Sequence, residues 1–196
     1  MVNLSNAIQN NMMDKAAIVG IGETEFSWNS GRSELQLACE AIKRACDDAG
    51  ISPKDIDGVF RFDTDSSTET MLVSALGIKN LRHWQGISFG GGAGNATVGH
   101  AAAALAAGQC TYAVCFRAAN LRSGVRLGQA RGPQLATGQR AFTTPFGALA
   151  PAHTFGQIAV RYMHTYGITS RHLGWVAVTL RHHASRNPRA LQREPI

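Results

Sequence analysis

The feature that most constrains the fold is a glycine cluster that leads directly into an apolar helix. Residues 90–94 read Gly-Gly-Gly-Ala-Gly, and residues 95–107 contain no Lys, Arg, Asp or Glu. A helix with almost no charge has no face that prefers water, so we expect it to be buried on all sides. Such burial requires other elements on both sides of the helix, as in a layered sandwich.

Strands and helices alternate along the rest of the chain. Short apolar and β-branched runs predict strands, and apolar residues three or four positions apart predict helices that glycines end. The predicted strands are residues 16–21, 58–62, 83–88 and 111–116. The predicted helices are residues 34–49, 66–76, 95–107, 154–166 and 170–185. This order predicts an α/β protein with a mainly parallel sheet.

Composition sets the class of protein. The chain has 196 residues and 44% apolar content, enough for one globular domain with a core. The first fifteen residues are polar, and no apolar run approaches the ~20 residues that span a bilayer. We therefore expect no membrane span and a cytoplasmic protein. The four cysteines have neither redox-pair nor zinc-site spacing, so we expect them to pack in the core and to bind no metal.

Charge is distributed unevenly along the chain. Residues 70–193 contain thirteen Lys and Arg and no acidic residue, whereas twelve of the thirteen acids lie between Asp14 and Glu69. The cations stand singly among small and apolar residues, which argues against nucleic acid as a partner. A ligand with a few phosphates, such as a coenzyme A thioester, fits this pattern better. A catalytic carboxylate, if there is one in this chain, must lie before residue 70.

Several stretches together resemble the thiolase superfamily. They include AAIVGIGETEFSWNSGRSELQLACEA, FGGGAGNATVGHAAAAL, FRAANLRSGVRLGQ and the segment from RYMHTYG to RHHASRNP. The combination is most similar to the lipid-transfer-protein branch, the sterol-carrier-type thiolase-like proteins, and within it to aldolases of steroid side-chain degradation. The resemblance covers nearly all of residues 15–196.

The resemblance implies a fold of two similar βαβαβαββ halves. This chain would supply an incomplete first half with a loop-region insertion, ending before that half's closing strand. The implied organisation is a flexible N-terminus (1–15), the core of the half (16–116), a loop excursion (117–150) and helices covering the sheet (151–196).

The glycine cluster bears on the chemistry that the family could perform here. A true thiolase holds the acyl group on a cysteine at the start of the buried helix, and the resemblance places Gly91 at that position. A retro-aldol cleavage of a β-hydroxyacyl-CoA needs no nucleophile, only a base and hydrogen-bond donors for the thioester enolate. We therefore expect an aldolase whose substrate lies against Gly90, Gly91, Gly92 and Gly94. The alternative is that the glycines serve only a tight turn and close packing.

Two other functions stay open. One is an acyl-CoA acyltransferase that uses a cysteine elsewhere, although Cys110 and Cys115 lie at the end of the helix or in the next strand. The other is a non-catalytic lipid carrier or scaffold.

The remaining candidate residues follow the glycine cluster in the chain. His153 is a candidate catalytic residue. The resemblance implies that the remaining catalytic residues lie in a second half. Arg122 and Arg126 could bind the phosphates of coenzyme A, which we expect as substrate and not as a bound cofactor. His100 is expected to be a core histidine. As partners, the resemblance implies a second copy of the chain and an OB-fold protein with a zinc ribbon, in some cases fused to a hydratase.

Overall fold

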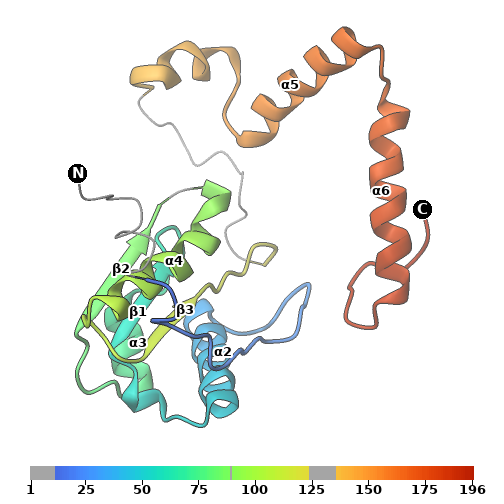
Figure 1. Ribbon diagram of the computed structural model, residues 1–196. Helices are drawn as coiled ribbons and strands as arrows, with labels where there is room; N and C mark the ends of the chain where they lie inside the picture. Colours follow the sequence, from blue (N-terminus) through green and yellow to red (C-terminus); the bar gives the residue numbers. More distant parts are fainter. Residues whose placement is uncertain (1–11, 89, 124–135) are drawn as a thin grey trace. The chain divides into compact units, whose positions relative to one another are not determined.

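The computed structural model describes residues 12–88, 90–123 and 136–196 (Figure 1). The chain divides into two compact units, and each is described by itself. Unit 1 comprises residues 1–25 and 31–120, and unit 2 comprises residues 26–30 and 121–196. Most of the N-terminal stretch 1–15 that we expected to be flexible lies outside the described residues.

A small parallel sheet forms the centre of unit 1. Its strands are β1 (Gly58–Phe62), β2 (His83–Ile87) and β3 (Ala113–Phe116), in the order β2-β1-β3. The central strand β1 pairs through Val59 with Trp84 on one side and with Val114 on the other. Four of the five residues of β1 are buried, as expected for a parallel strand covered on both faces. The prediction of a parallel sheet is confirmed.

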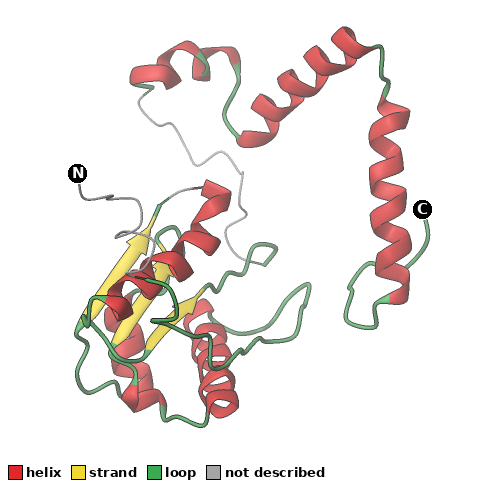
Figure 2. Ribbon diagram, viewed as in Figure 1, coloured by secondary structure: helices red, strands yellow, loops and turns green. Residues whose placement is uncertain are grey.

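Helices cover both faces of this sheet (Figure 2). Val59 packs into a cluster with α2 (Glu34–Ala49) and α3 (Glu69–Leu76), whereas the next residue, Phe60, packs against α4 (Ala93–Ala106). Successive strand residues point to opposite faces, so α4 lies on the face of the sheet opposite to α2 and α3.

Local capping sets the bounds of α2 and α3. Ser33 accepts a hydrogen bond from the backbone N–H of Gln36 at 3.1 Å, and α2 ends at Gly50 with φ +69°. We expected α3 to begin at residue 66. It begins three residues later because Thr68 is its N-cap, accepting from the backbone N–H of Met71.

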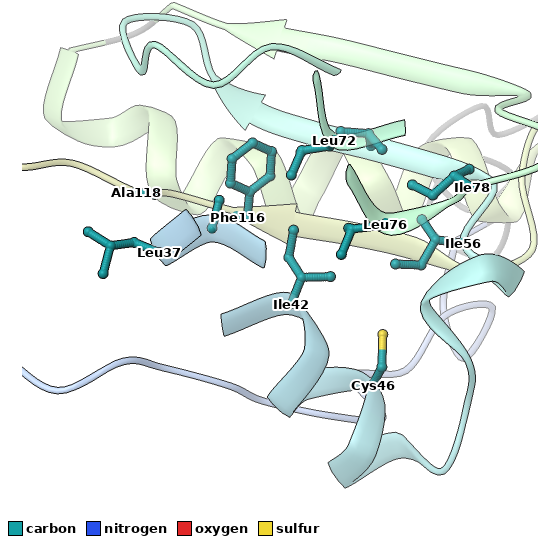
Figure 3. Close-up of a cluster of buried hydrophobic side chains, with 11 residues drawn as sticks. Leu37, Ile42, Cys46, Ile56, Leu72, Leu76, Ile78, Phe116 and Ala118 are labelled. Carbon is teal, nitrogen blue, oxygen red and sulfur yellow. The ribbon is translucent and has the colours of Figure 1, made fainter. Parts of the chain in front are cut away.

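The largest apolar cluster of unit 1 lies between the sheet and the pair α2 and α3 (Figure 3). Its buried members are Leu37, Ala38, Ile42, Cys46, Ile56, Val59, Leu72, Leu76, Ile78, Phe116 and Ala118. Cys46 is therefore a core residue, as its position on the apolar face of the helix predicted.

The predicted strand 16–21 is wrong. The structure gives this segment no strand, and Ile18 and Ile21 are each 76% exposed. The segment lies against α2, where Asp48 accepts a hydrogen bond from the backbone N–H of Ile21 at 2.9 Å. Gly20 and Gly22 permit this close approach, because a Cβ at either would overlap backbone atoms of α2. The segment cannot pair with the central strand β1, because β2 and β3 already occupy both of its edges.

The expectation that α4 is buried on all sides is also wrong. Its buried residues, Ala93, Thr97, Ala101 and Ala104, form the single face that meets the sheet. On the other face Val98 is 43% exposed, and His100, expected in the core, is exposed as well. Its apolar composition predicted burial, but within the described part of unit 1 no element covers the second face of the helix.

Unit 2 is mainly helical. It contains the 3₁₀ turns η3 (Gly138–Phe142) and η4 (Thr144–Phe146) and the helices α5 (Pro151–Tyr166) and α6 (Ser170–Arg186). Neither α5 nor α6 has a buried residue among those described. Their role as cover for the sheet stays a prediction. No helix among the described residues is long and apolar enough to cross a membrane.

Candidate functional site

The glycine cluster lies at the start of α4, where the chain makes a short 3₁₀ turn (Gly90–Gly92) before the helix. Gly90 has φ +48°, a conformation that favours glycine. The N-cap residue Gly92 provides no side-chain hydrogen bond to the helix. The first N–H groups of a helix have no partner within it, so this end presents backbone donors and the positive end of the helix dipole.

Space is open around these backbone donors. Gly90, Gly91, Gly92 and Gly94 are all exposed, and an added Cβ at Gly91 or Gly94 would meet no atom within 4 Å. Close packing among the described residues therefore does not explain why Gly91 and Gly94 are glycines. The geometry leaves room for a ligand beside the helix start.

A thiol lies behind the first turns of α4. The Thr97 hydroxyl donates to the carbonyl of Gly94 at 2.6 Å, and the Cys115 thiol donates to the carbonyl of Thr97 at 3.6 Å. Burial, and secondly the neighbouring Cys110, raise the pKa of the Cys115 thiol to about 11. A thiol with this pKa is almost entirely protonated at neutral pH, so it is a poor nucleophile.

Sequence reasoning missed a buried carboxylate that follows β1. Asp65 is 8% exposed, accepts a hydrogen bond from the backbone N–H of Ala118 at 3.0 Å, and lies 3.5 Å from Arg117. Burial raises the pKa of Asp65, while Ala118 and Arg117 oppose the rise. Asp65 precedes residue 70, where we expected any catalytic carboxylate. Its contacts link the loop after β1 to the segment after β3, which is a structural role.

Glu34 forms a second link of this kind. It accepts from the backbone N–H of Asn120 at 3.0 Å and from the hydroxyl of Ser66. These hydrogen bonds, the one from Asn120 first, lower the pKa of Glu34. The sequence does not predict the contacts of Glu34 and Asp65, because their hydrogen-bond partners are 32 to 86 residues away along the chain.

The basic candidates belong to unit 2. Arg122 is exposed, and its guanidinium carbon lies 4.1 Å from the centroid of the Trp28 ring. This cation–π contact holds the guanidinium over one face of the aromatic ring. No sequence pattern predicts Trp28 as the partner of Arg122. Arg126 lies outside the described residues.

His153 caps α5 with its side chain. Its Nδ1 atom accepts hydrogen bonds from the backbone N–H groups of Leu149 at 3.0 Å and Ala150 at 3.2 Å. An imidazole that accepts at Nδ1 carries its proton at Nε2, so this ring offers a donor and not a base to a ligand. The catalytic role of His153 stays a prediction, and this geometry favours hydrogen-bond donation.

The structure brings the four glycines together in unit 1, and it places His153 and Arg122 in unit 2. Among residues 12–88, 90–123 and 136–196, no group of three or more His, Cys, Asp or Glu could hold a metal ion. The site that the geometry defines is the open start of α4: backbone donors, space, and no nucleophilic side chain.

Comparison with known proteins shows what this chain is similar to. No protein-family model matches the chain. A steroid side-chain-cleaving aldolase of Thermomonospora curvata is 50% identical over 181 residues, covering 89% of this chain and 46% of the relative. The 17-hydroxy-3-oxo-4-pregnene-20-carboxyl-CoA lyase of Mycobacterium tuberculosis is 49% identical over 181 residues, covering 90% and 47%.

A solved structure is similar as well. The Ltp2-ChsH2(DUF35) aldolase superposes with a TM-score of 0.80 at 47% sequence identity, covering 92% of this chain and 46% of that one. The chain thus spans about half the length of each of these relatives.

Proposed function

We propose that the protein is a thiolase-like carbon–carbon lyase that performs retro-aldol cleavage of a β-hydroxyacyl-CoA side chain in steroid degradation. The observation that carries the proposal is the identity of 49% to 50% to a lyase and an aldolase named for steroid substrates. The exposed, uncapped start of α4 agrees with this chemistry.

The reaction assigns a role to the glycines. A base removes the β-hydroxyl proton, the oxygen becomes a ketone carbonyl, and the Cα–Cβ bond breaks. The electron pair passes to the thioester as an enolate, which is then protonated at Cα to give a shorter acyl-CoA. Backbone N–H groups of Gly91, Gly92 and their neighbours would hold the enolate oxygen. One such donor contributes about 10²- to 10³-fold in rate in related oxyanion sites.

The thiol chemistry favours a lyase over an acyltransferase. Residue 91 is glycine, and burial raises the pKa of each of the four cysteine thiols. At pH 7 a thiol with a pKa of about 11 is ionised in roughly one molecule in ten thousand. An acyl-enzyme on a cysteine of this chain would form slowly.

Further parts of the proposal concern assembly. We extend the thiolase-like architecture of two similar halves to the whole protein, and propose that it is a cytoplasmic homodimer. The paired names of the similar aldolase structure support a second protein component. We propose that this component has an OB fold and a zinc ribbon, in some cases fused to a hydratase. The coenzyme A thioester is substrate and not a resident cofactor.

Incubation of the natural full-length protein and its co-purifying partner with a steroid β-hydroxyacyl-CoA tests the proposal. We expect equal amounts of ketone and shortened acyl-CoA, and an unchanged intact protein mass. A trapped acyl-protein would support an acyltransferase instead. Saturable ligand binding without turnover would support a lipid carrier.

A further inference from the structure

One arginine of unit 1 has no role in the reaction described above. Arg117 is the first residue after β3, and 46% of its side chain is exposed. Phe116 and Ala118, on either side of it in the sequence, belong to the cluster that faces α2 and α3 (Figure 3). Because successive residues of an extended chain point to opposite faces, Arg117 lies on the face of the sheet that carries α4.

An aromatic ring links Arg117 to the start of α4. The guanidinium carbon of Arg117 lies 4.5 Å from the centroid of the Phe62 ring, at the end of β1. Phe62 belongs to a buried cluster with Ile87 and with Ala93, the first residue of α4. A single apolar cluster therefore connects the guanidinium to the first turn of this helix.

The topology of the sheet leads to the same place. The three strands are parallel, so their carboxyl ends lie along one edge. The glycine cluster follows the carboxyl end of β2, and Arg117 follows that of β3. In open parallel α/β sheets, ligands bind outside the carboxyl ends of the strands. Arg117 thus lies at the edge and on the face of the sheet that hold the candidate site.

A buried carboxylate orients the guanidinium. An oxygen of Asp65 lies 3.5 Å from Nε of Arg117, and the Asp65 side chain is only 3% exposed. Asp65 also accepts from the backbone N–H of Ala118 at 3.0 Å, which fixes the carboxylate to the same segment of chain. Because the carboxylate lies on the Nε side, the two terminal nitrogens form the positive end of this ion pair.

Arg117 keeps donors for a further partner. On the neighbouring strand, Arg61 donates from Nε to Glu69 at 2.8 Å and from Nη1 to the carbonyl of Asp63 at 3.0 Å. By contrast, Asp65 is the single ionic or hydrogen-bonding partner of the Arg117 side chain within the part of the chain that the structure describes. An arginine has five N–H donors, so a guanidinium held in this way can bind a ligand anion without rearranging.

We propose that Arg117 is a catalytic residue, whose terminal nitrogens stabilise the negative charge on the thioester oxygen at the start of α4, and that Asp65 is its positioning residue. The proposal rests on the proposed function. A cation that is fixed before the reaction stabilises a developing charge without reorganisation. Arg117 exchanges no proton in this role. It stabilises the enolate, together with the backbone donors of α4, until Cα is protonated.

Steady-state kinetics of the full-length protein and its co-purifying partner, with the steroid β-hydroxyacyl-CoA, test the catalytic role. Because the interaction strengthens in the transition state, we expect Arg117→Gln to lower kcat about 100-fold with little change in KM. Arg82→Gln is the matched control. Arg82 is 44% exposed and lies 3.4 Å from the largely buried Asp57, at the amino end of the same sheet, so this variant should turn over like the wild type. An unchanged kcat in Arg117→Gln, or a raised KM alone, would overturn the proposal.

A pair of backgrounds tests the positioning role of Asp65. If Asp65 acts through Arg117, Asp65→Asn should lower kcat about tenfold in the wild type and have no further effect in Arg117→Gln. The same loss in both backgrounds would show that Asp65 does not act through Arg117. Free guanidinium should restore part of kcat to Arg117→Ala, whereas urea, which has a similar shape and no charge, should not. Equal recovery with urea would overturn the role of the charge.

A measurement without substrate distinguishes the failure of this inference from the failure of the proposed function. The thiol of Gly91→Cys reports the electrostatic potential at the start of α4, because a nearby cation stabilises the thiolate. Adding Arg117→Gln should lower the thiolate fraction at pH 7 about tenfold, measured as alkylation rate against pH, and adding Arg82→Gln should not change it.

The two measurements together decide between the outcomes. If the wild type performs no lyase reaction but Arg117→Gln lowers the thiolate fraction, the function fails and the assignment of Arg117 to the site stands. If the wild type turns over and Arg117→Gln has the same kcat, the inference fails and the function stands. A thiolate fraction that does not depend on Arg117 would also overturn the inference.

Discussion

At the scale of single residues, the cysteines allow a direct check of the site chemistry. Burial raises the pKa of all four thiols, most strongly at Cys115, where it is about 11. We therefore predict slow alkylation of the folded protein at pH 8. A new thiol in Gly91→Cys, exposed near the positive end of the α4 dipole, should react at least about tenfold faster. Alkylation rates from intact mass spectra measure both, and equal rates would contradict the open geometry of this helix start.

Glu34 allows a pH-dependent check. Hydrogen bonds from Asn120 and Ser66 lower the pKa of Glu34 in the folded protein. Its contribution to stability is therefore present above the ordinary glutamate pKa of about 4.3, and is lost as pH falls through the lower folded-state pKa. We predict that Glu34→Gln lowers the free energy of unfolding by about 1 kcal/mol at pH 7.

Urea denaturation at several pH values measures this contribution. The difference between the wild type and Glu34→Gln should shrink as the pH falls below 4. Asp47→Asn, at an exposed position on the same helix, controls for the general loss of a negative charge. A difference that is constant with pH would show that the hydrogen bonds to Glu34 contribute nothing.

At the scale of elements, α5 and α6 both begin with a cap formed by a histidine side chain. Nδ1 of His172 accepts from the backbone N–H of Thr169 at 3.0 Å, just as Nδ1 of His153 accepts from Ala150. Each histidine satisfies a backbone donor at a helix start that has no cap from the N-cap side chain. We predict that His153→Ala destabilises the start of α5 by about 1 kcal/mol, the usual contribution of a helix cap.

Amide hydrogen exchange resolves this effect by residue. Exchange in the first turn of α5 should accelerate about fivefold in His153→Ala, with little change in α6. His164→Ala removes a histidine from the same face of α5 without removing a cap, and should leave the exchange of the first turn unchanged. Equal exchange in the two variants would refute the capping role.

Elements with local signals could be predicted from the sequence. Ser33 and Gly50 determine the bounds of α2 through contacts with residues a few positions away, and these bounds were predicted correctly. The segment 16–21 has the composition of a strand, but pairing depends on distant residues, and the structure places the segment against α2 instead.

Some features of the candidate site could likewise be predicted from the sequence, and others could not. The glycines at the start of α4 are visible in the sequence because the cluster is contiguous. The burial of Asp65 is not visible, because its partner Ala118 is 53 residues away. The capping by His153 is local, but histidine is not among the residues that usually cap a helix start. Composition predicted an apolar environment for α4, but it could not show which side of the helix would be covered.

At the scale of the whole molecule, exposed apolar side chains on α5 and α6 predict association of the 196-residue chain. Phe155, Ile158, Tyr162 and Tyr166 share one face of α5 and are each more than half exposed. Extended apolar surface of this kind is unfavourable in water and marks interaction surfaces. We predict that the chain binds the dye ANS and sediments faster as its concentration rises.

Charged substitutions on this face should reverse the association. Because each side chain is already exposed, the double variant Phe155→Glu, Ile158→Glu should retain helix content, bind less dye and sediment as a smaller species. Val160→Glu with Gln157→Glu, which places the same charges on the opposite face of α5, is the matched control. If the control lowers association as much as the double variant, net charge and not the apolar face governs it. Sedimentation that does not depend on concentration would contradict the prediction altogether.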